Sequence, residues 1–92
     1  MIRDEIKHIV YNCLINQYYN DDIRIKLMSK PNDGEDELLY DELKFDSLDM
    51  IEFMISVEKE IGNGFIFEDD LIDSQITLRK VIDYINIKVN GK

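Results

Sequence analysis

Residues 44–64 read KFDSLDMIEFMISVEKEIGNG and contain the clearest helical pattern in the chain. From Leu48 to Ile61, apolar residues recur at the three- and four-residue spacing of an amphipathic helix. Gly62-Asn63-Gly64 follows directly, and such residues favour the left-handed backbone that commonly ends a helix. The stretch predicts a helix over residues 48–61 and therefore a fold built on helices.

The same spacing appears on both sides of this helix. Residues 2–18 carry one apolar stripe, and residues 78–89 carry another, preceded by Thr77 as a suitable N-cap. Residues 67–72 allow one short helical turn before the last helix. The sequence predicts a single all-α domain over residues 1–92, with a helical core over about 2–89. We expect an up-and-down bundle of three principal helices plus one short helix.

Residues 20–46 form a long connection between the first two predicted helices. It is polar at residues 32–36 and becomes apolar again in its second half. The apolar positions of that half are Leu38, Leu39, Tyr40, Leu43 and Phe45. We therefore expect the second half of the connection to pack on the bundle.

Charge and composition exclude several classes of protein. The 92 residues include 20 acidic and 11 basic side chains, which give a formal net charge of −9. This charge opposes binding to nucleic acid or anionic membranes and favours partners with basic surfaces. No apolar stretch has the length of a bilayer-spanning segment, so we expect no membrane insertion. The single cysteine, Cys13, and an N-terminus unlike a signal peptide favour a cytoplasmic protein, which we expect to be a monomer.

The predicted helix over residues 48–61 is apolar over about twice the arc that one core-facing stripe needs. The residues expected to face the core are Phe53, Met54, Val57 and Ile61. Leu48 and Ile55 lie well to one side, next to a polar face that is rich in acids. Two interpretations are open. Leu48 and Ile55 are exposed and form a recognition surface with the acids, or the long connection covers them and the acids only keep the protein in solution.

Ser47 stands where the polar connection turns into this helix. Asp46 or Ser47 suits the N-cap position, which would explain the serine by capping alone. A helix N-terminus also favours an anion, so a phosphoester on Ser47 would be well placed. A catalytic serine is disfavoured because the only histidine, His8, has no recognisable partner to orient it. His8 and Cys13 do not share a helical face, so we expect neither a catalytic pair nor a metal site.

The sequence Asp46-Ser47-Leu48-Asp49, followed by Glu52 and an apolar helix, resembles the D-S-L-D-x-x-E signature of acyl carrier proteins. Residues 39–43, 58–61 and 77–85 resemble three further family segments: the approach to the serine, the acidic end of its helix and the last helix. The resemblance covers the C-terminal half of the chain in detail and residues 2–18 in pattern only. It implies the family's four-helix bundle, with a long loop between helices one and two.

The resemblance also implies a function. Ser47 would carry 4′-phosphopantetheine, transferred from coenzyme A by a magnesium-dependent phosphopantetheinyl transferase, with Asp46 as the flanking residue of the motif. The thiol of this arm would hold an acyl or aminoacyl group as a thioester, and the carrier itself would not be an enzyme. Its partners would be an acyl- or aminoacyl-activating ligase and downstream synthases or transferases with basic docking surfaces. The residues implied in partner binding are Leu48, Asp49, Glu52, Ile55 and Glu58.

Three departures from the family pattern bear on the pathway. Lys44 stands where the family usually has glycine, Lys59 stands where fatty-acid carriers usually have an acid, and residues 62–67 replace a short loop. These departures favour a stand-alone carrier in a polyketide, nonribosomal peptide or related specialised pathway. A housekeeping fatty-acid carrier and a D-alanyl carrier remain open. The alternative from another class is an acidic interaction module in which Ser47 is never modified.

Overall fold

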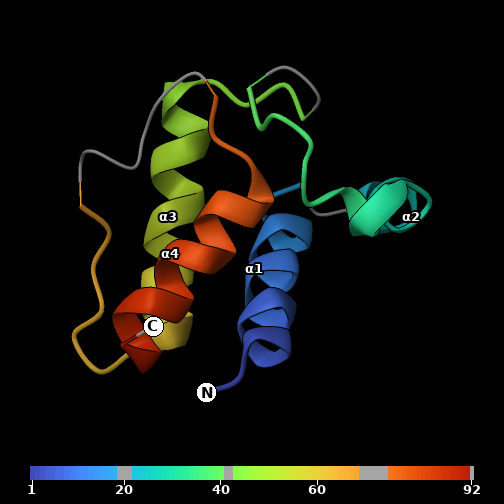
Figure 1. Ribbon diagram of the computed structural model, residues 1–92. Coiled ribbons are helices and arrows are strands. Elements are labelled where there is room, and N and C mark those ends of the chain that lie inside the picture. The colour runs from blue at the N-terminus through green and yellow to red at the C-terminus, as the bar shows by residue number, and fades with distance from the viewer. Residues whose placement is uncertain (19–21, 41–42, 69–74, 92) are drawn as a thin grey trace.

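The computed structural model describes residues 1–18, 22–40, 43–68 and 75–91. Three long helices form the body of this part (Figure 1), namely α1 (Arg3–Tyr18), α3 (Ser47–Ile61) and α4 (Leu78–Asn90). A shorter helix, α2 (Asp22–Met28), and a 3-10 turn, η1 (Pro31–Gly34), lie between α1 and α3 along the chain. Within the described ranges, the only extended pairing is an isolated antiparallel bridge between Leu38 and Thr77. The predicted all-α class is confirmed.

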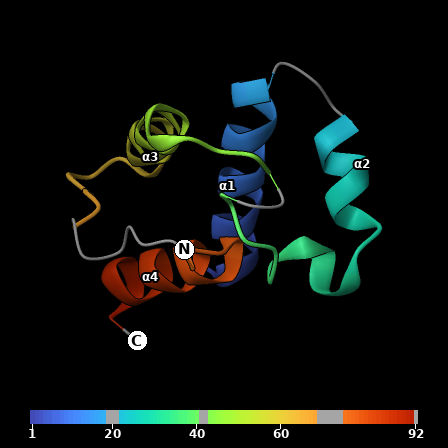
Figure 2. The ribbon, with the colours of Figure 1, turned by 90° about the horizontal axis from the view of Figure 1, so that it is seen from above.

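The first long helix, α1, is central to this arrangement. It packs against both α3 and α4, and Figure 2 shows α2 standing apart on the other side of α1. In Figure 1, α1 rises from the N-terminus, whereas α3 and α4 both start at the upper end and descend. The three long helices therefore do not alternate strictly up and down, which differs from the topology that we expected from the sequence.

The ends of α3 and α4 follow from their capping residues. Asp46 is the N-cap of α3, and Gly62 ends that helix with a φ of 70°. Thr77 caps α4, where its hydroxyl accepts a hydrogen bond from the backbone N–H of Lys80 at 3.2 Å. Gly91 ends α4 in the left-handed conformation, which costs glycine little because it has no Cβ. The long helices agree with the predicted ranges to within one residue at each end.

The short helix that we expected before the last helix is tested only at its first two residues. The expected helical turn at residues 67–72 begins at two residues that are not helical, Phe67 and Glu68, and its remaining residues lie outside the described part. The described ranges do contain a short helix that was not predicted, α2, within the connection between the first two predicted helices. No helix in the described ranges combines the length and apolar character that a membrane crossing needs.

The core lies between the three long helices and includes the second half of the connection. Phe53 is fully buried, and its ring meets that of Phe45 edge-on with 5.6 Å between centroids. Leu39 is also buried, and its backbone N–H donates to the carbonyl of Ile76 at 3.0 Å. All four residues predicted to face the core from α3 are buried, together with Met50. The expectation that the connection packs on the bundle is confirmed.

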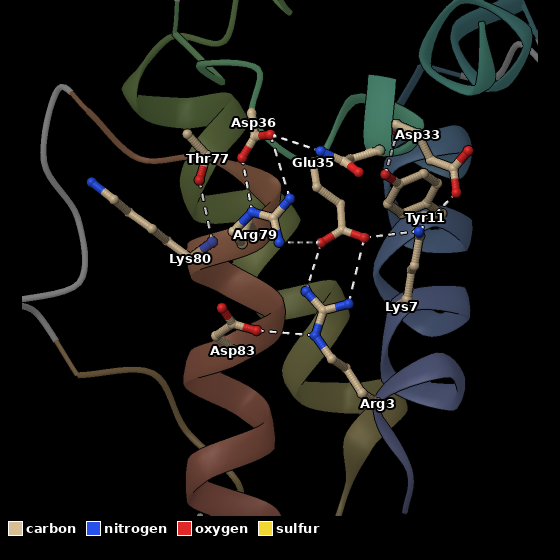
Figure 3. A network of polar contacts seen from close by, with 11 residues as sticks. Arg3, Lys7, Tyr11, Asp33, Glu35, Asp36, Thr77, Arg79, Lys80 and Asp83 are labelled. Atoms are coloured by element: carbon tan, nitrogen blue, oxygen red, sulfur yellow. Dashed lines mark hydrogen bonds and ion pairs between the residues drawn. The ribbon is translucent and has the colours of Figure 1, made fainter. Parts of the chain in front are cut away.

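An ion network fixes the connection to two helices (Figure 3). The carboxylate of Glu35 is buried and lies 2.6 Å from Arg3 and 2.8 Å from Lys7, both on α1. Arg79 of α4 lies 3.7 Å from the same carboxylate, and its backbone N–H donates to the Glu35 carbonyl at 2.8 Å. We call these four residues the Glu35 clasp.

Burial and pairing act in opposite directions on this carboxyl. Burial works to raise the pKa of Glu35, but the hydrogen bonds from Arg3 and Lys7 outweigh it and hold that pKa below its ordinary value. Glu35 is therefore charged at neutral pH, and its charge joins residues 31–40 to α1 and α4.

Candidate functional site

Ser47 is the first helical residue of α3, and its side chain is exposed. The N-cap is Asp46, whose carboxylate accepts a hydrogen bond from the backbone N–H of Asp49 at 2.8 Å. In return, the carboxylate of Asp49 accepts from the backbone N–H of Asp46 at 3.1 Å. The hydroxyl of Ser47 makes no hydrogen bond with any described residue. Capping therefore explains Asp46 and Asp49 but does not explain Ser47.

The segment before Ser47 is anchored at one residue and strained at another. Phe45 is buried against Phe53, and its backbone N–H donates to the carbonyl of Leu39 at 3.2 Å. Lys44 is exposed and has a φ of 59°, in the left-handed region that residues with a Cβ adopt at a cost. This is the position where the resemblance implies glycine. The backbone conformation there suits a glycine better than the lysine that occupies it.

The outer surface of α3 carries a row of exposed aliphatic side chains. Leu48 is 63% exposed, Ile51 is 51% exposed and Ile55 is 45% exposed. We call these three residues the aliphatic row. Of the two interpretations left open by the sequence, the exposure of Leu48 and Ile55 is confirmed, and the interpretation in which the connection covers them is wrong. Ile51 joins them because its three- and four-residue spacing places it between them on one face.

The acids named from the sequence have different surroundings. Asp46 and Asp49 form the capping box, whereas the exposed Glu52 accepts a hydrogen bond from the side-chain amide of Gln17 on α1 at 3.1 Å. Glu58 is half-buried and accepts from the backbone N–H of Phe67 at 2.8 Å. At 100° per residue, Glu52 and Glu58 flank the aliphatic row on opposite sides. The acids thus border the row, and Glu58 is also held by the segment that follows α3.

The remaining nucleophile and base lie on α1. His8 is exposed, whereas Cys13 is buried, and burial together with the charge of Glu60 raises the pKa of this thiol to about 11. A thiol with so high a pKa is protonated and unreactive at neutral pH. In the described part of the chain, no group of three or more His, Cys, Asp or Glu residues has the arrangement of a metal site.

A hollow of about 410 Å³ lies beside the aliphatic row, between the C-terminal part of α1 and the middle of α3. Its lining residues are Asn16, Gln17, Glu52, Ile55 and Ser56. Glu52 and Ile55 were predicted to bind partners, whereas the two residues of α1 were not predicted to belong to a site. Asn16 and Gln17 are 35 or more positions from Glu52 and carry no local pattern, so only the packing of α1 on α3 identifies them.

Comparisons with known proteins yield no relative: no protein-family model matches the chain, and no curated protein or solved structure matches it.

Proposed function

We propose that this protein is a stand-alone carrier that holds acyl or aminoacyl intermediates as thioesters on a 4′-phosphopantetheine arm attached to Ser47. The observation that carries the proposal is the exposed hydroxyl of Ser47, which has no hydrogen-bond partner among the described residues although it begins a well-capped helix. A serine needed for capping would be bonded to the backbone of the first turn. A serine that is a substrate for another enzyme needs only to be accessible.

For attachment of the arm, this chain needs to provide only the hydroxyl of Ser47. The oxygen of Ser47 forms a phosphodiester with phosphopantetheine, the adenosine bisphosphate portion of coenzyme A leaves, and the hydroxyl proton passes to the transferase. The carrier needs no base of its own. This agrees with the position of its single histidine, His8, which is exposed on α1, whereas Ser47 begins α3. When bound, the arm supplies a thiol that forms the thioester.

The N-terminus of α3 suits the charge of a phosphodiester. The first-turn N–H groups and the positive end of the helix dipole stabilise an anion by about 0.3–1 kcal/mol at an exposed site. Asp46 and Asp49 oppose this with negative charge, but each carboxylate is bonded to a backbone N–H. Lys44, exposed three residues before Ser47, adds a positive charge to the same segment.

The surface beside Ser47 supports a role in docking to partner enzymes. The aliphatic row offers apolar contact, and Asp49, Glu52 and Glu58 border it with negative charge, so a partner with a basic rim and an apolar centre fits it. The expected partners are a phosphopantetheinyl transferase, a ligase that activates the acyl or aminoacyl group, and synthases or transferases in the cytoplasm. We assign the carrier to a polyketide, nonribosomal peptide or related specialised pathway, with fatty-acid and D-alanyl carriers as alternatives.

The experiment that tests this function is incubation of the purified protein with coenzyme A, magnesium and a promiscuous phosphopantetheinyl transferase, followed by intact mass measurement. One added phosphopantetheine that is absent in Ser47→Ala supports a carrier. A folded wild-type protein that no transferase modifies would instead favour an acidic interaction module that uses the aliphatic row without any arm.

A further inference from the structure

Asparagine is followed directly by glycine at two places in this chain, Asn63-Gly64 and Asn90-Gly91. The side-chain amide of such an asparagine is prone to deamidation, because glycine has no Cβ to shield its backbone nitrogen from the asparagine side chain. The first pair lies in the turn after α3, and the second lies at the end of α4. The same reaction can therefore be compared in two different surroundings.

In the turn after α3, the two groups that would react are exposed. Asn63 and Gly64 have φ angles of 54° and 77°, and the N–H of Phe65 closes their turn by donating to the carbonyl of Gly62 at 3.0 Å. Neither the side-chain amide of Asn63 nor the backbone N–H of Gly64 makes a hydrogen bond with a described residue. A Cβ on Gly64 would meet no other part of the described protein within 4 Å, so the space around this backbone is open.

The end of α4 holds the same two groups in place. The side-chain amide of Asn90 donates to the side-chain oxygen of Asn86 at 2.6 Å, and the backbone N–H of Gly91 donates to the carbonyl of Ile87 at 2.8 Å. The nitrogen that would attack is thus bonded to the helix, and the carbon that it would attack belongs to an anchored side chain. Reaction at Asn90 therefore requires the helix end to open first.

We propose that Asn63 is a site of spontaneous deamidation in the folded protein, whereas Asn90 is protected. The backbone nitrogen of Gly64 loses its proton to hydroxide and attacks Cγ of Asn63. A bond forms between these two atoms, the Cγ–Nδ2 bond breaks, and Nδ2 leaves as ammonia with a proton from water, which produces a succinimide ring. Water then opens the ring at one of its two carbonyls and leaves aspartate or isoaspartate. The overall reaction consumes one water, releases one ammonia and involves no oxidation or reduction.

Either product places a carboxylate in the turn. Asn63 lines a hollow of about 630 Å³ between this turn and the end of α4, together with residues such as Ile61 and Lys88. Deamidation therefore adds a negative charge to the lining of this hollow. Isoaspartate also adds one methylene to the main chain and so lengthens the turn that the hydrogen bond between Phe65 and Gly62 closes. The reaction involves neither Ser47 nor the arm, so it is independent of the proposed function.

The test is a time course in which the folded full chain is incubated at mildly alkaline pH. Each sample is digested with trypsin, and mass spectrometry gives the deamidated fraction of each peptide. Cleavage after Lys59, Arg79 and Lys88 places Asn63 and Asn90 in separate peptides. A sample digested without incubation measures the deamidation that digestion itself causes. The same time course in guanidinium chloride gives the rates at both sites in the unfolded chain.

We expect Asn63 to deamidate about tenfold or more faster than Asn90 in the folded protein, because the closed helix end protects Asn90. In the unfolded chain the two rates should agree to within about threefold, since both asparagines then precede an unrestrained glycine. Asn63→Gln should remove the early mass increase of the intact folded chain, and Asn90→Gln, the matched control, should retain it. Equal rates at the two sites in the folded protein, or reaction of Asn63 only in guanidinium chloride, would overturn the proposal. Aspartate without isoaspartate at Asn63 would overturn the succinimide route, because direct hydrolysis gives aspartate alone.

Discussion

Asp46 and Asp49 cap each other across the start of α3, through hydrogen bonds of 2.8 and 3.1 Å between each carboxylate and the other residue's backbone N–H. Ser47 lies between them and takes no part in this exchange. The two aspartates therefore stabilise the helix end, while the hydroxyl of Ser47 has no hydrogen-bond partner among the described residues. This division of roles is the structural basis of the proposed carrier function.

Removal of the N-cap of α3, Asp46, should destabilise the protein while Ser47 itself is unchanged. We expect Asp46→Ala to lower the free energy of unfolding by about 1 kcal/mol, since it removes the acceptor for the N–H of Asp49. Asp46→Asn retains a side-chain oxygen at the same place and is the matched control. Urea denaturation followed by circular dichroism measures both, and an Ala variant as stable as the Asn variant would contradict the capping role.

The left-handed backbone at Lys44 predicts a gain in stability. Lys44→Gly should raise the free energy of unfolding by about 1 kcal/mol, because glycine adopts a φ of 59° without the clash of a Cβ. Lys44→Ala removes the same positive charge but keeps the Cβ, so it should give no such gain. If both variants change stability equally, charge rather than backbone strain explains the effect.

The Glu35 clasp predicts a specific dependence of stability on pH. The pKa of Glu35 is lower in the folded state than in the unfolded state. The charge of Glu35 therefore contributes fully to the free energy of unfolding at pH values above the unfolded-state pKa, and this contribution is lost as the pH falls through the folded-state pKa. Glu35→Gln should cost about 2 kcal/mol at neutral pH, since a buried, charge-paired carboxylate is removed. The difference between wild type and variant should shrink below a pH of about 4.5, the ordinary value for a glutamate.

Urea midpoints measured between neutral and acidic pH provide this comparison. Asp36→Asn is a useful contrast because Asp36 pairs with Arg79 at 2.8 Å but is mostly exposed, so solvent screens the pair and its loss should matter less. A Glu35→Gln difference that stays constant down to strongly acidic pH would show that the charge of Glu35 does not stabilise the fold.

The exposed aliphatic row should matter for partners and not for folding. Leu48→Ala should change the free energy of unfolding by no more than about 0.5 kcal/mol, since the side chain is 63% exposed. It should lower kcat/KM for modification by a phosphopantetheinyl transferase about fivefold or more, as loss of an interface contact does. Ile66→Ala, at a similarly exposed position outside α3, is the control. Equal effects of the two variants on kcat/KM would remove the case for the row as a docking surface.

The features that were predictable from the sequence are those that depend on local patterns. Periodicity over residues 48–61 located α3, and the surplus of apolar residues on it identified Leu48 and Ile55 as candidates for exposure, with cover by the connection as the alternative. α2 was missed because Ile23, Ile25 and Leu27 alternate at a spacing of two, which is typical of a strand rather than a helix. Its seven residues are also too few to show helical periodicity.

Polar contacts between distant parts of the chain could not be predicted from the sequence. The Glu35 clasp joins positions 3, 7, 35 and 79, and nothing near Glu35 in the sequence indicates that its carboxylate is buried. The hydrogen bond from Gln17 to Glu52 likewise depends on how α1 packs on α3. One long-range expectation did succeed, because the apolar residues of the connection, such as Leu39 and Phe45, had to be buried somewhere on the bundle.

Attachment of phosphopantetheine at Ser47 is decided by the intact mass of three proteins after transferase treatment: wild type, Ser47→Ala and Ser56→Ala. Ser56 lies on the same helix as Ser47, so Ser56→Ala is a control that removes a serine hydroxyl from α3 but leaves Ser47 in place. We expect one phosphopantetheine on wild type and on Ser56→Ala, and none on a folded Ser47→Ala. Modification of Ser47→Ala, or none of the folded wild type with several transferases, would contradict this expectation.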